Sequence, residues 1–143
     1  ITGSSLPFSQ EDNVTYFRYS EPVHVNGFTT VRAKVPVFFL SSEGSWISHD
    51  FIVDTGADVS VMGKSFASRL AYFSVPRAYS LGQVKGHFVG QYTVFKAKIM
   101  DKAFYLPTVV VEDEDYILGR AGFLDHFRIH FEPYGFKVEP IHY

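Results

Sequence analysis

Three observations predict a mostly β fold for this chain of 143 residues. Segments rich in Val, Ile, Phe, Tyr and Thr follow one another between short turn signals, which is the pattern of strands. Helical periodicity is confined to short segments, so the sequence predicts one or two short helices at most. The composition, 46% hydrophobic and 17% aromatic, supplies enough apolar side chains for a folded core.

The first third of the chain is predicted to be extended. The turn signals "VNGF" and "SSEGS" separate its β-rich segments. Pro22 and Pro36 lie within these segments, and proline lacks the N–H that a central strand needs, so we expect edge positions or bulges there. The predicted strands cover residues 16–25, 29–40 and 45–54.

The rest of the chain mixes hairpins with short helical segments. A short helix is predicted over 65–73, because apolar residues fall on one stripe. A hairpin with three glycines in its middle is expected over 78–100, and a further strand over 102–111. Residues 121–127 are expected to form one or two helical turns, and residues 127–141 a final hairpin.

The bulk composition excludes several functional classes. The 13 Lys and Arg nearly balance the 15 Asp and Glu without a basic stripe, so nucleic acid is not an expected partner. No apolar run approaches the roughly 20 residues of a membrane span. With no cysteine, disulfides, thiol catalysis and cysteine-based zinc sites are excluded. No signal peptide is visible, and the compartment is left open, with the cytoplasm slightly favoured.

The first 15 residues are treated separately from the fold. The opening "ITGSS" has the composition of an expression remnant or a loose end. We therefore expect residues 1–15 to be a flexible N-terminal extension and residues 16–143 to form a single domain.

Several short motifs are rejected on spacing. "MGKS" (62–65) resembles the end of a phosphate loop, but Asp58 stands where that loop needs glycine. "HFRIH" (126–130) has strand period rather than the helical period that would bring its histidines to one zinc ion. "EDED" (112–115) lacks the glycine and spacing of a calcium loop. No metal and no cofactor is expected.

The stretch "FIVDTGADVSVM" (51–62) ends an apolar run on a carboxylate. One interpretation is an Asx-type turn, in which Asp54 caps nearby backbone N–H groups. The tripeptide Asp-Thr-Gly is weak support for anything more, because roughly 3% of chains of this length contain it by chance. Its context is more informative, since "ILGR" (117–120) follows with Gly119 placed 65 residues after Asp54.

These two motifs resemble those of the retropepsins, the single-domain aspartic proteases of retroviruses, retroelements and related cellular and bacterial proteins. The family's Asp-Thr-Gly-Ala-Asp loop is complete as Asp54 to Asp58, and its apolar-apolar-Gly-Arg signature stands at Ile117 to Arg120. The resemblance covers roughly residues 20–132, and the ending is more similar to cellular or prokaryotic members than to compact viral ones. It implies a closed, barrel-like β domain in which the hairpin over 78–100 is the flap.

The resemblance also implies a chemistry. Asp54, within the triplet that Thr55 and Gly56 complete, would be catalytic. Two carboxylates that share one proton can activate a water and protonate the peptide carbonyl, and aspartic proteases are themselves the known example. Gly56 would let the backbone approach the carboxylate, and in this family the Thr55 hydroxyl bonds to the partner loop.

The chain offers one such aspartate where the site needs two. No other aspartate is followed by Thr-Gly or Ser-Gly, and 143 residues cannot hold two lobes. We therefore expect a homodimer in which Asp54 of each subunit meets at the two-fold axis, acting on extended polypeptides. The final hairpin is the expected interface segment. The alternative is a catalytically silent binding or dimerisation module; a metal hydrolase using the six histidines fails on their spacing.

Asp58 and Arg120 match the family's intrachain ion pair; the other interpretation is two exposed charges. The backbone of Ala57 and Asp58 would hold the substrate main chain as an added strand. Ile52, Val61 and Ile117 match side-pocket walls, and ordinary core packing explains them equally well.

The flap tip is expected within "VKGHFVG" (84–90), with Gly86 near its apex. Val84, Lys85, Gly86 and His87 are accordingly predicted to be near substrate. Lys85 and His87 depart from the viral pattern, and both interpretations, solvated turn residues or substrate contacts, stay open.

Overall fold

The computed structural model describes residues 14–74, 76–83 and 86–142, and over 79–83 and 86–89 it describes the backbone alone. Of the predicted N-terminal extension, residues 1–13 lie outside this description, and Thr15 already belongs to a strand. The part of the chain that the structure describes is mostly β, with 57% strand and 3% helix, as predicted. The described residues divide into two compact units, one of residues 34–125 and one of residues 14–33 with 126–142. Within the described residues, no helix has the length and apolar character needed to cross a membrane.

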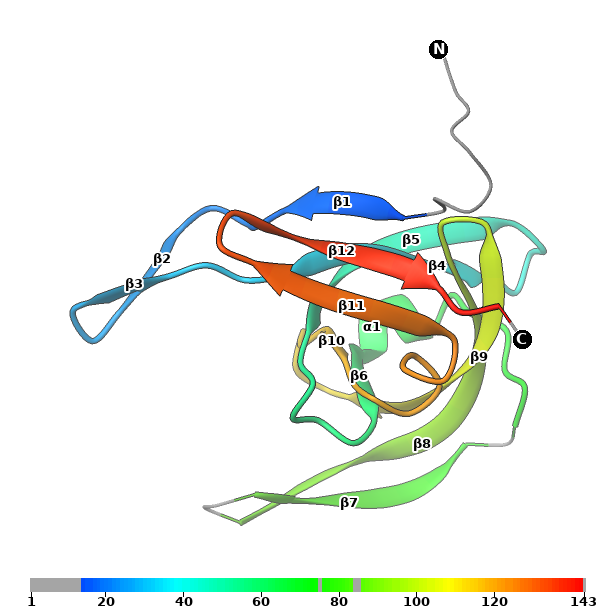
Figure 1. Ribbon diagram of the computed structural model, residues 1–143. Coiled ribbons are helices and arrows are strands. Elements are labelled where there is room, and N and C mark those ends of the chain that lie inside the picture. The colour runs from blue at the N-terminus through cyan, green and yellow to red at the C-terminus, as the bar shows by residue number, and fades with distance from the viewer. Residues whose placement is uncertain (1–13, 75, 84–85, 143) are drawn as a thin grey trace. The chain divides into compact units, whose positions relative to one another are not determined.

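A closed barrel of six strands forms the unit of residues 34–125 (Figure 1). Its strands follow the order β4-β5-β10-β6-β9-β8, and pairing of β4 with β8 closes the ring. A further strand, β7, pairs with β8 to make a long hairpin. The bounds are β4 Lys34–Leu40, β5 Trp46–Val53, β6 Ser60–Gly63, β7 Arg77–Gln83, β8 Gly86–Ile99, β9 Lys102–Val111 and β10 Ile117–Leu118.

The alternation of the sequence explains the inside of the barrel. In β4, Val35, Val37 and Phe39 are fully buried, while the residues between them are at least partly accessible. In β8, Phe95 and Ala97 are buried in the same way. The rings of Phe39 and Phe95 meet edge to face with 6.1 Å between their centroids. Period-2 patterning therefore places the aromatic residues of strands far apart in sequence in one core.

The helix predicted over 65–73 is present but spans only Lys64–Ala67, named α1. After it the backbone bonds join residues three apart instead of four: the N–H of Leu70 donates to the carbonyl of Ala67 at 3.0 Å. The helical turns expected over 121–127 do not extend into a helix: residues 121–126 form turns, with one bond of helical spacing from the N–H of Leu124 to the carbonyl of Arg120 at 3.0 Å, and Phe127 begins strand β11. Gly122 has a φ of +79°, which is incompatible with a right-handed helix.

The other unit holds a three-stranded antiparallel sheet in the order β1-β12-β11. Its strands are β1 Thr15–Arg18, β11 Phe127–Glu132 and β12 Gly135–Pro140. The final hairpin predicted over 127–141 is therefore confirmed. Phe17 and Phe131 lie opposite Phe136 in the register, and the rings of Phe17 and Phe136 stack with 5.3 Å between centroids. One row of aromatic rings therefore crosses this sheet.

Two of the predicted strands are each divided in two. A small hairpin of β2 Val23–Val25 and β3 Phe28–Thr30 turns at Asn26-Gly27, where both residues have positive φ. The strand expected over 29–40 is interrupted between β3 and β4. There Arg32 bonds to Ser20, through its carbonyl at 2.9 Å to the backbone N–H and through its own N–H at 3.1 Å to the hydroxyl. These bonds replace the ladder that a continuous strand would need.

Candidate functional site

The Asp54 loop begins where β5 ends, and its backbone is held by short-range bonds. Oδ1 of Asp54 accepts a hydrogen bond from the N–H of Gly56 at 2.9 Å, and the carbonyl of Asp54 accepts one from Ala57 at 3.1 Å. The N–H of Asp54 donates to the carbonyl of Leu118 at 3.0 Å. The Asx-type turn is therefore present. Asp54, Thr55 and Gly56 are all exposed in the single chain.

The two sequence motifs end at the same edge of the barrel. Strand β10 pairs in parallel with β5, so that Leu118 lies beside Val53. Asp54 and Gly119, the next residue of each strand, therefore leave the sheet together. A Cβ on Gly119 would lie 2.4 Å from the carbonyl oxygen of Val59, so only glycine fits between the two loops.

Backbone bonds join the two loops directly. The N–H of Arg120 donates to the carbonyl of Ala57, and the N–H of Ala121 to the carbonyl of Asp58, both at 2.9 Å. The shape of the Asp54 loop thus depends on the second motif as well as on its own turn.

Arg120 adds side-chain contacts to the same loop. Its Nη1 donates to the carbonyl of Thr55 at 2.9 Å, and its Nη2 contacts Oδ1 of Asp58. The two residues of the predicted ion pair are therefore in contact. Their side chains are 47% and 82% exposed, so burial does not enforce this pair, and its contribution is at most about 1 kcal/mol.

The predicted side-pocket residues lie next to one another. Ile117 is paired with Ile52 on one side and with Val61 on the other. Val61 is 8% exposed and belongs to a buried cluster with Val109 and Val111, against which Ile117 packs. Ile52 and Ile117 are half-buried, so their surface is shared between the core and the outside. Both interpretations, pocket wall and core, fit this placement.

The predicted flap is a regular hairpin. In its described part, Gly86 pairs with Gln83 and His87 pairs with Gly82. Val84 and Lys85 lie outside the described residues, and the side chain of His87 is not described. Their contact with substrate stays a prediction.

Ser60 is a site residue that the sequence analysis missed. Its side chain is fully buried, and its hydroxyl accepts a hydrogen bond from the N–H of Gly119 at 3.0 Å. The one available signal was a hydroxyl in the apolar run "VSVM". That signal is weak, because serine is common in strands that have no site.

A second missed group surrounds Tyr116, the residue before β10. Its carbonyl accepts a bond from the N–H of Ile52 at 3.0 Å, and its ring stacks on His49 with 3.6 Å between centroids. Its hydroxyl donates to Oε2 of Glu114 at 3.1 Å. Burial raises the pKa of Tyr116; a hydrogen bond with Ser65 lowers it, while the bond to Glu114 and that carboxylate's charge raise it.

The described residues contain no group of three His, Asp or Glu side chains placed to hold a metal ion. No model of a known protein family matches the chain, and no curated protein matches it significantly. The functional assignment therefore depends on the motifs and on the geometry of the two loops.

Proposed function

We propose that this chain is one subunit of a homodimeric, retropepsin-like aspartic endopeptidase. The observation that carries the proposal is that the Asp-Thr-Gly and Gly-Arg motifs end side by side at one edge of the barrel. There, hydrogen bonds within and between the two loops hold the exposed carboxylate of Asp54. The closed barrel and the long β7–β8 hairpin also support it.

In the proposed reaction, Asp54 of one subunit accepts a proton from a water, whose oxygen attacks the scissile carbonyl carbon. Asp54 of the partner donates its proton to the carbonyl oxygen, and collapse of the tetrahedral intermediate transfers a proton to the leaving amine. Two carboxylates at close range cannot both be ionised, so the pair holds one proton in the acid range. A single chain holds only half of this group, and the exposure of Asp54 leaves it accessible to a second copy.

Substituting Asn for Asp54 tests the mechanism without removing the turn. The amide oxygen of Asn can still accept the Gly56 bond, so the fold should persist while the carboxylate is lost. We expect cleavage of a peptide library to fall by about 10²–10⁴-fold. Asp101→Asn, at an exposed turn, is the matched control and should retain activity. Cleavage by Asp54→Asn at the wild-type rate would disprove the mechanism.

Dimer formation has its own test. The specific activity of the wild-type chain should rise with protein concentration, and an excess of Asp54→Asn subunits should suppress it by forming mixed dimers. A peptidase whose specific activity is constant on dilution, and which sediments as a monomer, would contradict the shared site.

The alternative, a silent binding or dimerisation module, is favoured by one observation. The carboxylate of Asp54 is already used locally by the N–H of Gly56, so a structural role alone would explain the residue. A dimer that binds pepstatin-like transition-state mimics weakly, and cleaves no peptide at acid pH, would support this alternative.

A further inference from the structure

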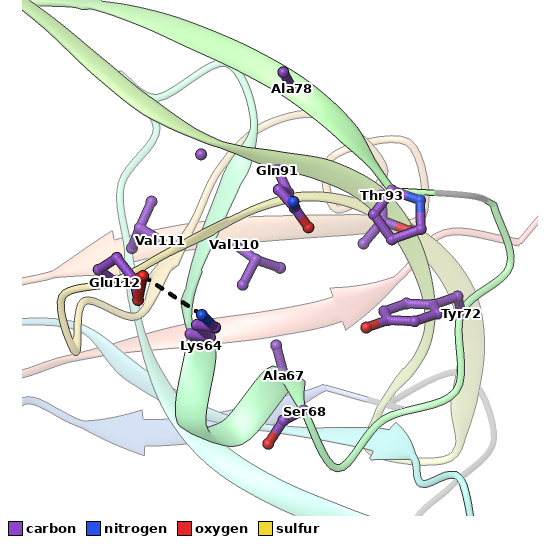
Figure 2. A pocket seen from close by; sticks show the side chains of 12 residues that line it. Lys64, Ala67, Ser68, Tyr72, Ala78, Gln91, Thr93, Val110, Val111 and Glu112 are labelled. Atoms are coloured by element: carbon purple, nitrogen blue, oxygen red, sulfur yellow. Dashed lines mark hydrogen bonds and ion pairs between the residues drawn. The ribbon is translucent and has the colours of Figure 1, made fainter.

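Two short motifs that fail as ligand loops contact each other. The "MGKS" segment (62–65) ends β6 and begins α1, and the "EDED" segment (112–115) follows β9. Nζ of Lys64 lies 3.5 Å from Oε1 of Glu112, beside a cavity of about 370 Å³ that both residues line (Figure 2). Because both side chains are largely exposed, this ion pair by itself contributes little to stability.

Glu114 makes the more specific contacts between the two motifs. The hydroxyl of Ser65 donates to Oε1 of Glu114, and the hydroxyl of Tyr116 donates to Oε2 at 3.1 Å. Both carboxylate oxygens therefore accept a hydrogen bond, one from α1 and one from the residue before β10. Hydrogen bonds to an ionised carboxylate are stronger than those between neutral groups. We call these three side chains the Glu114 bridge.

Gly63 supplies the space for the Glu114 bridge. A Cβ at this position would lie 1.9 Å from Oε2 of Glu114 and 2.7 Å from the hydroxyl oxygen of Tyr116. The backbone of Gly63 is extended, with φ −70° and ψ 144°, a conformation that other residues adopt as readily. The bridge, rather than the backbone, therefore explains the glycine.

The Glu114 bridge lies at one end of the pairing between β6 and β10. These strands are antiparallel, and their register places Ile117 opposite Val61. At the other end of this short pairing, the hydroxyl of Ser60 accepts the N–H of Gly119. A slip of one residue would turn Ile117 to the opposite face and separate Ser60 from Gly119. Because β10 has only two residues, contacts at the two ends of the pairing decide where it lies.

We propose that Glu114 is a positioning residue for the Asp54 loop. Its carboxylate holds the start of β10 to α1, and β10 leads into the bonds that support the loop. The N–H of Asp54 donates to the carbonyl of Leu118, and the N–H of Arg120 to the carbonyl of Ala57. The effect of Glu114 on peptide cleavage rests on the proposed function, whereas its effect on the loop does not.

Amide hydrogen exchange, measured by NMR on the full-length chain, tests this role without reference to activity. In Glu114→Ala, the amides of Asp54 and Gly119 should exchange about threefold to tenfold faster, because β10 opens locally more often. The amides of the β8–β9 ladder are the internal reference and should change by less than about twofold. Unchanged loop amides, or loop and ladder amides that accelerate together, would overturn the proposal.

The matched control is Asp113→Ala, in the same acidic run. The side chain of Asp113 is exposed and forms no hydrogen bond or ion pair with the residues that the structure describes. This variant should leave loop and ladder amides unchanged. The same acceleration in Asp113→Ala as in Glu114→Ala would contradict a specific role for Glu114.

Gly63 gives a second test of the Glu114 bridge. Gly63→Ala should displace the exposed Glu114 carboxylate and accelerate exchange of the loop amides as much as Glu114→Ala does. In the double variant Gly63→Ala/Glu114→Ala the displaced group is absent, so exchange should be no faster than in either single variant. Additive accelerations in the double variant would overturn the bridge.

Two milder variants separate geometry from charge. Glu114→Gln keeps the side-chain length, and its amide can accept from one hydroxyl and donate to the other, so loop exchange should stay within about twofold of wild type. Exchange as fast as in Glu114→Ala would contradict the bridge. Ser65→Ala removes one of the two bonds, should accelerate loop exchange about twofold to fivefold, and replaces Glu114→Ala if that variant does not fold. Wild-type exchange in folded Ser65→Ala would also overturn the proposal.

Peptide cleavage gives the catalytic readout. Glu114→Ala should lower kcat about threefold to tenfold with little change in KM, because the catalytic carboxylates lose their alignment while substrate contacts remain. Glu114→Gln should restore kcat to within about twofold of wild type. An unchanged kcat in Glu114→Ala with accelerated loop exchange would show that the support does not serve catalysis. A wild-type chain that cleaves no peptide would refute the proposed function, and hydrogen exchange would still decide the role of Glu114.

Discussion

The hydroxyl of Ser60 accepts a 3.0 Å hydrogen bond from the backbone N–H of Gly119, and both residues are buried. Ser60 opens the strand that follows the Asp54 loop, and Gly119 opens the second loop. This bond therefore links the two loops from inside the barrel, while the Arg120 contacts link them at the surface.

Removal of the Ser60 hydroxyl should destabilise the protein. Ser60→Ala leaves the buried N–H of Gly119 without its acceptor, at a cost of about 1–3 kcal/mol in the free energy of unfolding. Urea unfolding measures this loss. The control is Ser68→Ala, which removes an exposed hydroxyl that donates to the carbonyl of Ser65 at 2.8 Å. That variant should lose less than about 0.5 kcal/mol. Equal losses would show that the internal link is unimportant.

The two motif glycines should respond differently to alanine. Gly119→Ala places Cβ 2.4 Å from the backbone oxygen of Val59, so the loops must move apart, and we expect a loss of about 3 kcal/mol. Gly56→Ala places Cβ 3.2 Å from Oδ1 of Asp54, an exposed atom that can shift, so the loss should stay within about 1 kcal/mol. Thermal unfolding compares the two. If the proposed peptidase activity is present, it should fall in Gly56→Ala although the free energy of unfolding changes little, because Gly56 holds Oδ1 of Asp54.

The contact between Asp58 and Arg120 should contribute little energy by itself. A double-mutant cycle of Asp58→Asn and Arg120→Met should give a coupling free energy below about 1 kcal/mol, smaller still at high salt, because both side chains are substantially exposed. Arg120→Met should nonetheless cost more than Asp58→Asn, since it also removes the 2.9 Å bond to the carbonyl of Thr55. A coupling of several kcal/mol would indicate a buried pair.

Tyr116 should make stability sensitive to alkaline pH. Its pKa is raised above the ordinary value of 10.0 in the folded state, chiefly by burial. The neutral phenol therefore stabilises the fold; this contribution is complete below pH 10.0 and is lost as pH rises through the raised folded pKa. Tyr116→Phe should flatten the alkaline decline of the unfolding free energy, whereas Tyr134→Phe, whose tyrosine is 87% exposed, should not. Parallel declines in wild type and Tyr116→Phe would exclude this role.

Local patterns in the sequence predicted the local structure well. The hairpins over 78–100 and 127–141 follow from strands separated by short turn signals, and both are present. The helical turns expected over 121–127 do not extend into a helix, because Gly122 has a positive φ that its neighbours in the sequence do not reveal. The break between β3 and β4 was also not predictable, since it depends on bonds from Arg32 to Ser20.

Pairings between distant residues were beyond local patterns. Closure of the barrel by β4 and β8 joins Phe38 to Lys98, and periodicity within each strand does not specify its partner. In the candidate site, the family resemblance predicted that Asp58, in the Asp54 loop, contacts Arg120. The bond from Ser60 to Gly119 was not predictable, because a buried serine in an apolar strand has the same local pattern with or without a partner.

The parallel pairing of β5 with β10 has a consequence for synthesis of the chain. The ribosome makes the Asp54 loop early, but the atoms that hold it, the carbonyl of Leu118 and the N–H groups of Gly119 and Arg120, are made more than 60 residues later. Until then the loop has its own turn but lacks these supports, and closing so long a segment is slow. A nascent chain that ends before β10 therefore contains the Asp-Thr-Gly sequence but not the supported loop. The supported loop can form only after β10 has been made and has paired with β5.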